Sequence, residues 1–237
     1  MERVAKERVR SGDGVVVITL AGDNYESSKP VRSVEDGVVV YRFSAPNIFP
    51  YQNLSKHNFI LKLIWHKIDI FNFWSARIVK RILEQEKPDE VQTHNLMGIG
   101  FCLKTMIGRS KDRKIKWTHY LHDVQLVEPS GVLSWNHERD DLWQKIYSWI
   151  MRWRIGKPDA VLSPSVFLQE FYQKRGFFPR STYHITRNME HVTWNNERRL
   201  RAGGDTRFLF VGSLVEHKGI RVLVRVWDGV DKKARIE

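Results

Sequence analysis

Short apolar runs and longer amphipathic segments alternate from one end of the chain to the other. The short runs are rich in Val, Ile and aromatic residues, as buried strands are, whereas the longer segments repeat their apolar residues every three or four positions, as helices do. Parallel strands need a crossover connection between them, and helices supply it. The alternation therefore predicts an α/β fold, in which a Rossmann-like and mostly parallel sheet carries helices on both faces.

The predicted elements can be placed by residue number. The strands are expected at Val15–Leu20, Val38–Phe43, Asp89–His94, Ile115–Leu121, Asp159–Ser163, Tyr183–Ile185 and Phe208–Val211. The helices are expected at residues 1–10, at Asn58–Glu86 with a break, around Phe101–Met106, at 143–154 with an end near Gly156, at Val166–Arg175, and from Lys218-Gly219 onward.

Ligands of such sheets gather at the carboxyl ends of the strands, so the residues that follow the predicted strands are the candidate site residues. They are His94, Asn95, His122, Asp123, Ser165, Asn188, Gly212 and Ser213. Adjacent residues of an extended segment point to opposite faces, so we do not expect His122 and Asp123 to act as a dyad. Ser165 has a second interpretation, as the N-cap of the helix that follows it.

The segment 207–220 predicts a strand, a tight turn and a helix N-terminus beside a lysine. Unpaired backbone N–H groups and the helix dipole both favour an anion at such a place, and Lys218 lies next to them. One interpretation is a phosphate site that includes Lys218. The alternative is a solvated lysine at the start of a helix, as in any α/β protein.

The net charge of +12, with a pI near 9.9, favours anionic partners. Nucleic acid is the least favoured of them, because the chain has no zinc-ligand spacing, no GXXG loop and no RNP-like aromatic strand. We therefore predict no nucleic-acid partner. Phosphorylated ligands and an anionic membrane surface remain as candidate partners.

Two predicted helices interleave aromatic with basic residues, within residues 62–67 and 143–154. This composition suits a membrane surface. One stripe of the second helix holds Leu142, Ile146, Trp149, Ile150 and Trp153. Because an apolar stripe usually faces the core, we expect this one to be buried in the domain.

The single cysteine, Cys102, excludes an internal disulfide and fits a reducing compartment. We expect it to be a small buried residue. No early apolar stretch resembles a signal peptide, and none reaches the roughly 20 residues of a spanning helix. The expected location is the cytoplasm. Peripheral association with the inner face of the membrane is kept as a further alternative.

Five segments carry a resemblance to a known family. They read PDEVQTHN at 88–95, THYLHD at 118–123, DAVLSPS at 159–165 with Gly176-Phe177 after it, ITRN at 185–188, and FVGSLVEHKG at 210–219. They resemble the segments PDVVHTHN, VHTLHD, DAVIAPSEFL with a later GF, IPNG and FVGRLVPEKG of the retaining GT-B glycosyltransferases of family 4. The order and spacing of the five segments, across residues 1–227, make the resemblance specific.

The resemblance implies a division of the chain. Residues 1–188 correspond to an acceptor-side Rossmann-like domain, 189–205 to a linker, and 206–237 to the start of a nucleotide-sugar-binding domain. It also implies that the family's first strand with its glycine-rich loop, and its C-terminal E-x7-E motif, lie outside this sequence. We therefore expect the chain alone to be inactive. An unstable remnant with unpaired sheet edges is a further possibility.

The resemblance also implies roles for the candidate residues. Lys218 neutralises the donor diphosphate as charge builds on the leaving group, with Gly212 and Ser213 beside it. The family usually has an arginine where Ser213 stands, so part of that charge is missing here or supplied elsewhere. His122 lies near the donor sugar and the acceptor hydroxyl. The expected cleft-lining residues are His94, Asn95, Asp123, Ser165 and Asn188.

The implied reaction moves a hexose from a UDP- or GDP-sugar to a hydroxyl of a glycan or lipid-linked acceptor, with retention and by front-side attack. No metal or other cofactor is expected, because the chain has no D-x-D motif and no metal-ligand spacing. Two alternatives stay open. One is another GT-B enzyme, an epimerase or phosphorylase, and the other is a non-catalytic basic module that binds an anionic membrane or a partner protein.

Overall fold

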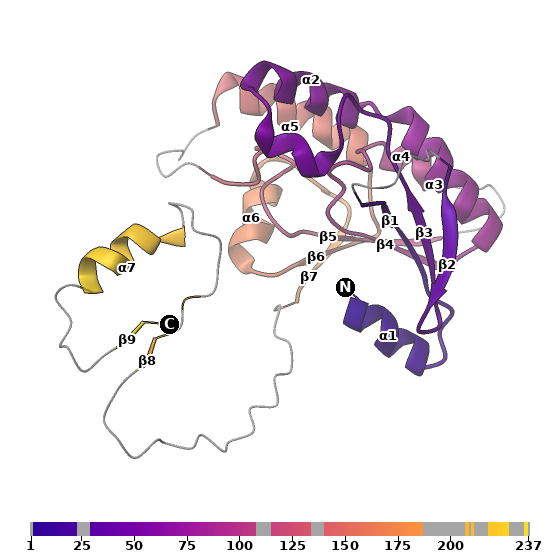
Figure 1. The fold of residues 1–237 in the computed structure, drawn as a ribbon. Helices are drawn as coiled ribbons and strands as arrows, with labels where there is room; N and C mark the ends of the chain where they lie inside the picture. The colour runs from indigo at the N-terminus through magenta and orange to yellow at the C-terminus, as the bar shows by residue number, and fades with distance from the viewer. Residues whose placement is uncertain are drawn as a thin grey trace, which may run out of the picture. The chain divides into compact units, whose positions relative to one another are not determined.

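A computed structural model describes residues 2–22, 29–107, 115–133, 140–186, 207–208, 210, 218–227 and 235–236. The chain divides into two compact units, Met1–Asn188 and Met189–Glu237, and each is described by itself (Figure 1). The predicted linker 189–205 lies outside the described residues, and the assignment of domain roles stays a prediction.

The larger sheet of the first unit consists of four parallel strands in chain order. They are β4 (Glu90–Thr93), β5 (Lys116–Tyr120), β6 (Ala160–Ser163) and β7 (Thr182–Ile185). Each of them lies where a strand was predicted, and the Rossmann-like α/β class is confirmed. Because all four run in one direction, their carboxyl ends meet at one edge of the sheet.

The smaller sheet has the order β1-β3-β2 and mixes two directions. Strands β1 (Val16–Leu20) and β3 (Val38–Phe43) are parallel, as predicted, but β2 (Val31–Glu35) is antiparallel to β3 and was not predicted. Strands β2 and β3 form a hairpin around Asp36-Gly37, whose φ angles of 50° and 81° are the positive values that a tight hairpin turn requires.

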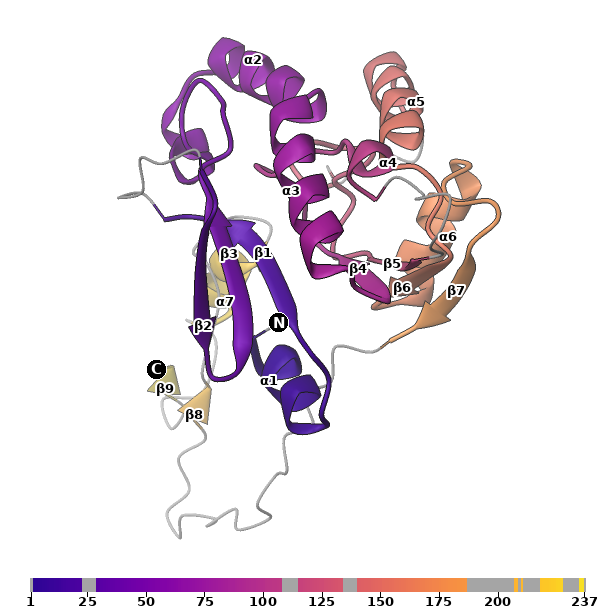
Figure 2. The same ribbon diagram turned by 90° about the vertical axis from the view of Figure 1, so that its right-hand side faces the viewer.

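Within the described part of the chain, β1 and β4 each lie at an end of their sheet (Figure 2). Strand β1 pairs with β3, and β4 pairs with β5. The possibility of an unstable remnant with unpaired sheet edges stays untested by this arrangement, because any open sheet has two end strands.

The helices of the first unit are α1 (Glu2–Arg10), α2 (Phe59–Ile70), α3 (Phe73–Glu86), α4 (Leu103–Met106), α5 (Leu142–Ile155) and α6 (Val166–Lys174), with a 3₁₀ turn at Tyr51–Lys56. The break expected within Asn58–Glu86 falls at Phe71-Asn72. Asn72 caps α3, because its side chain accepts a hydrogen bond from the Ser75 N–H at 2.9 Å.

Helix α5 faces the core with the side opposite to the predicted one. Most of the expected stripe is exposed, by 74% at Leu142, 65% at Trp149 and 58% at Trp153, and only Ile150 of its five residues packs against the core. The buried residues of the helix are Gln144, Tyr147, Ser148, Met151, Arg154 and Ile155. At 3.6 residues per turn these two sets lie on opposite sides of the helix, so the prediction of a buried aromatic stripe is wrong.

The reason for this orientation is the buried Arg154. Its Nε donates to the Ile70 carbonyl at 3.1 Å, and its Nη2 contacts the Cys102 sulfur. Its guanidinium also lies against the rings of Phe71 and Phe73, at 5.0 and 4.7 Å from their centroids. These contacts stabilise the buried guanidinium, although hydrophobic patterning alone predicts that an arginine here is exposed to solvent. Cys102 is buried, as expected.

The second unit contains α7 (Ile220–Trp227) and a parallel pair of short strands, β8 (Arg207–Phe208) and β9 (Arg235–Ile236). The helix lies where it was predicted. Gly219 before it has a φ of 74°, and Lys218 is exposed. The predicted strand Phe208–Val211 is shorter and begins one residue earlier, and Phe210 lies outside it.

No helix within the described ranges combines the length and the apolarity that crossing a bilayer needs.

The orientation of α5 can be tested with two substitutions of similar size. Met151 is fully buried and Leu142 is exposed. We expect Met151→Ala to lower the free energy of unfolding by about 2–5 kcal/mol, because it leaves a cavity. Leu142→Ala is expected to change it by about 0.5 kcal/mol or less. Urea unfolding measures both, and a larger loss for Leu142→Ala contradicts this orientation.

Candidate functional site

The parallel pairing of β4 with β5 brings two of the predicted site residues together. His94 directly follows β4, and His122 lies two residues beyond β5. Because Thr93 pairs with His119 in this register, the segments that follow β4 and β5 leave the sheet side by side. The Nδ1 atom of His94 lies 3.1 Å from the Nε2 atom of His122, which is a hydrogen-bond distance. We call these two residues the histidine pair.

Tyr120 packs against both members of the histidine pair. Its ring centroid lies 5.1 Å from that of His94 and 5.2 Å from that of His122, and both contacts are stacked. Its hydroxyl is 2.7 Å from the Thr186 hydroxyl, just beyond β7. Tyr120, which is bonded near the end of β7, therefore holds both imidazole rings in place by stacking.

Burial keeps the histidine pair neutral near pH 7. Burial is the main cause of the low pKa of His94, which is about 4, and the neighbouring His122 contributes to the same shift. Burial also lowers the pKa of His122, although the Asp123 carboxylate opposes this change. The Nε2 atom of His94 is buried and has no hydrogen-bond partner among the described residues, so a proton there lacks an acceptor. The pair can exchange hydrogen bonds but carries no charge.

A buried network under the histidine pair fixes β4 against β5. The Thr93 hydroxyl lies 2.9 Å from Nδ1 of His119 and accepts a hydrogen bond from Nε1 of Trp117 at 3.0 Å. Burial lowers the pKa of His119 to about 3, so this ring is neutral as well. The sequence pattern predicted only that these residues lie within strands.

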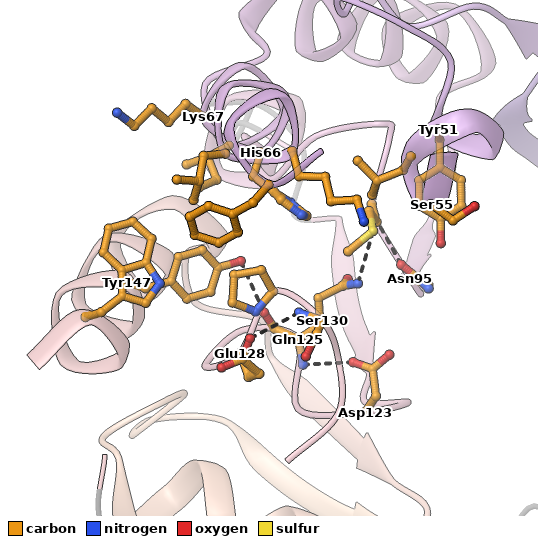
Figure 3. Close-up of a pocket in the computed structure, with 18 of the residues that line it drawn as sticks. Tyr51, Ser55, His66, Lys67, Asn95, Asp123, Gln125, Glu128, Ser130 and Tyr147 are labelled. Atoms are coloured by element: carbon orange, nitrogen blue, oxygen red, sulfur yellow. Dashed lines mark hydrogen bonds between the residues drawn. The ribbon is translucent and has the colours of Figure 1, made fainter. Parts of the chain in front are cut away.

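A large pocket with a volume of about 860 Å³ opens at this edge of the sheet (Figure 3). Asn95 and Asp123, which follow the two histidines, line it, whereas the histidines themselves border a separate small cavity. Helix α2 lines the large pocket on one side and α5 on another, and the loops after β4 and β5 complete it. Most of its wall is apolar. The polar and charged side chains on the wall include Gln52, Ser55, Lys62, His66, Lys67, Asn95, Asp123, Gln125, Glu128 and Ser130. The size and mixed chemistry are those of a small-molecule site.

Two buried tyrosines hold the loop that follows β5. The Tyr172 hydroxyl on α6 donates to the Asp123 carbonyl at 2.8 Å and accepts from the Leu126 N–H at 3.2 Å. The Tyr147 hydroxyl on α5 donates to the Gln125 carbonyl at 3.2 Å. The loop that carries the polar pocket wall is thus fixed by side chains of two helices.

Asp123 lines the pocket and also borders the small cavity at the histidine pair. Its carboxylate accepts a hydrogen bond from the Gln125 N–H at 2.9 Å. The Oδ2 atom lies so close to Gly131 that a Cβ added there is only 3.2 Å away. The expectation that His122 and Asp123 form no dyad agrees with this geometry.

The other candidates fall in different places. Asn95 is exposed, lines the pocket, and accepts a hydrogen bond from the Met97 N–H at 3.1 Å. Ser165 accepts from the Leu168 N–H at 3.2 Å and so caps α6, which is the second interpretation given to it above. Asn188, Gly212 and Ser213 lie outside the described residues. Lys218 belongs to the second unit.

Several pocket residues were missed from the sequence. His66, Gln125, Glu128 and Tyr147 line the pocket, but none of them directly follows a predicted strand. Burial lowers the pKa of His66, and the Glu128 carboxylate opposes this change. The one available signal was the polar loop 122–130, which follows β5 at the ligand edge of the sheet.

Among the residues that the structure describes, no three His, Cys, Asp or Glu side chains are grouped so that they could hold a metal ion.

The fold and the site together define a Rossmann-like α/β ligand-binding domain with its site at the carboxyl ends of parallel strands. The chain belongs to glycosyltransferase family 4, whose family model matches residues 1–189. The match covers the whole first unit, including the histidine pair and the pocket.

A similar protein is found in Klebsiella pneumoniae, where it is described as an uncharacterized 42.6 kDa protein in the cps region. It is 27% identical to this chain over 219 residues, which make up 91% of this chain and 56% of that protein. The chain therefore spans about half the length of this relative.

The neutrality of His94 predicts a pH dependence of stability. The folded pKa of about 4 lies below the ordinary 6.5, so the unfolded state binds more protons between these values. His94 thus costs stability as the pH falls from 6.5 toward 4. Buried Asp69, with a pKa raised to about 7 by burial, acts in the opposite direction. The test is therefore a difference between variants that share Asp69.

We expect His94→Gln to gain stability relative to the wild type as the pH falls through this window. Urea unfolding at several pH values from 7.5 to 4 measures the difference, with His184→Gln at an exposed position of β7 as the matched control. A difference that stays constant with pH, or that grows in favour of the wild type, contradicts the neutral histidine pair.

Proposed function

We propose that this chain contributes the acceptor side and part of the donor side of a GT-B glycosyltransferase. The reaction moves a hexose from a UDP- or GDP-sugar to a hydroxyl of a glycan or lipid-linked acceptor, with retention of anomeric configuration. Membership of family 4 supports the transferase class. The relative in a cps region supports a role in polysaccharide biosynthesis, and the proposed setting is the cytoplasm.

The observation that carries the proposal is a neutral histidine pair at the ligand edge of the sheet, followed on each strand by a residue, Asn95 or Asp123, that lines a large and mostly apolar pocket. A sugar hydroxyl needs hydrogen-bond partners without a competing fixed charge, and neutral imidazoles can donate and accept. The apolar wall suits the lipid part of an acceptor, whereas Asn95, Asp123 and Gln125 suit its hydroxyl groups.

In this proposal His122 arranges the reactants. His122 is exposed, and its Nε2 atom is within hydrogen-bond distance of His94. This contact orients the imidazole ring and leaves its Nδ1 atom for the substrate. His94 and Tyr120 are positioning residues, because they act through the His122 ring. Asp123 is the nearest carboxylate in the sequence and offers an acceptor for a hydroxyl group at the pocket wall.

We assign the donor diphosphate to the second unit. Lys218 is exposed next to the N-terminus of α7, where both the side chain and the helix dipole favour an anion. Ser213 and Gly212 complete the proposed loop. Ser213 brings no charge, so Lys218 is expected to supply most of the leaving-group stabilisation, and the reaction is proposed to need no metal or further cofactor.

Acceptor binding can be measured with the chain itself. We expect octyl hexosides, titrated below their micellar concentrations in a calorimeter, to bind in the pocket. Asp123→Asn is expected to weaken binding about 3- to 10-fold through the loss of one charged acceptor. Glu84→Gln, at an exposed position of α3, is the matched control. Binding that neither substitution alters places the acceptor elsewhere.

Transfer is measured with radiolabelled UDP- and GDP-hexoses and lipid extracts as acceptors. We expect no turnover from residues 1–237 alone. A chimera to which the Klebsiella relative supplies both a first strand with its glycine-rich loop and the part that follows Trp227 is expected to transfer hexose. His122→Ala is expected to lower its rate at least about 100-fold, and Lys218→Ala about 100- to 1,000-fold. An active chimera that tolerates both substitutions contradicts these roles.

A further inference from the structure

The outward side of α5 is apolar although it faces away from the core. Leu142, Ile146, Trp149 and Trp153 are all exposed, and two of them are tryptophans. The opposite side of the same helix is fully packed against the domain. Most of the surface of these side chains is therefore left in water, which is unfavourable for so many large apolar groups.

A second exposed apolar group lies on α2 and the start of α3. Its members are Phe59, Ile60, Ile64, Phe71, Phe73 and Trp74. In both views of the ribbon, α2 and α5 lie at the same end of the first unit, away from α1 (Figures 1 and 2). They also line one pocket between them.

The buried Arg154 connects the two groups into one surface. Its guanidinium lies 5.0 Å from the Phe71 ring centroid, 4.7 Å from that of Phe73 and 5.2 Å from that of Trp153. Each of these three rings is partly exposed. We call the exposed residues of α2, the start of α3 and α5 the α2–α5 face.

The charge on the α2–α5 face is positive. Helix α5 presents the exposed Lys145 and Arg152, has the buried Arg154 beneath them, and contains no Asp or Glu between residues 142 and 155. Helix α2 contains Lys62 and Lys67, and its one carboxylate, Asp69, is fully buried. Carboxylates occur at the N-terminal end of α5, where Asp141 caps the helix and Asp140 is paired with Arg175 at 2.6 Å.

We propose that the α2–α5 face docks on the surface of an anionic lipid bilayer. Tryptophan rings with lysines beside them are the composition that lies at the boundary of headgroups and acyl chains. Anionic headgroups attract the basic residues. A second copy of the chain is disfavoured as the occupant, because two such faces bring like charges together.

This docking places the pocket lined by α2 and α5 at the membrane surface. That consequence rests on the proposed function, since it gives a lipid-linked acceptor a short path into the pocket. The docking itself does not depend on the proposed function, and it is measured without any sugar donor.

The test is vesicle sedimentation with the full chain. We expect it to pellet with vesicles of phosphatidylcholine containing about one-third phosphatidylglycerol, to pellet much less with phosphatidylcholine alone, and to be released by roughly 0.5 M salt. The double variant Trp149→Ala/Trp153→Ala is expected to lower partitioning at least about tenfold. Lys67→Glu/Lys145→Glu is expected to lower it by a similar factor.

The matched controls lie on other faces of the same unit. Phe167→Ala removes an equally exposed aromatic ring of α6, and Arg81→Glu reverses an exposed charge of α3. Both are expected to leave partitioning unchanged. Circular dichroism and urea unfolding check that every variant keeps the wild-type fold, as expected for exposed positions.

Three results overturn the proposal. One is no pelleting with anionic vesicles. Another is an equal loss of pelleting in Phe167→Ala or Arg81→Glu. The third is a dimeric mass in sedimentation velocity that reverts to monomer in Trp149→Ala/Trp153→Ala, because a second copy then covers the face.

Discussion

The parallel register of β4 through β7 is the constraint on which the rest of the structure depends. It brings the carboxyl ends of four strands to one edge, and the pairing of Thr93 with His119 sets His94 beside His122. A slip of one residue turns the side chains of a strand to the other face and separates the pair. Trp117, Thr93 and His119 hold this register from inside the sheet, so the chemistry at the edge rests on buried hydrogen bonds beneath it.

Much of the fold and part of the site followed from the sequence. Alternation located β4 to β7, and topology placed His94, Asn95, His122 and Asp123 at one edge. The contact between His94 and His122 could not be predicted, because a strand order gives the edge but no distances between side chains. Strand β2 was missed although Asp36-Gly37 between two β-rich runs is a hairpin signal. The pocket residues of α2 and α5 depend on helix packing, which strand ends do not reveal.

Helix α5 shows where patterning fails. Periodicity divides a helix into two faces but does not say which one is buried. The more apolar face is normally the buried one. Here the buried face includes Gln144 and Arg154, and both find partners. Gln144 completes the capping box with Asp141 and donates to Glu128 at 3.1 Å, and Arg154 is enclosed by a carbonyl, a sulfur and aromatic rings. Specific polar contacts outweigh the apolar stripe, which is left for another surface to cover.

The central feature of the site is a hydrogen bond between two neutral histidines at the carboxyl edge of the sheet. It is tested most directly by ¹⁵N nuclear magnetic resonance of histidine-labelled protein, in which the ring nitrogens report protonation and tautomer. At pH 7 we predict neutral rings for His94 and His122, both with a pKa below the ordinary value, and a shift of the His122 ring signals in His94→Gln. A charged ring for either residue at pH 7, or His122 signals that ignore the loss of His94, contradicts the account.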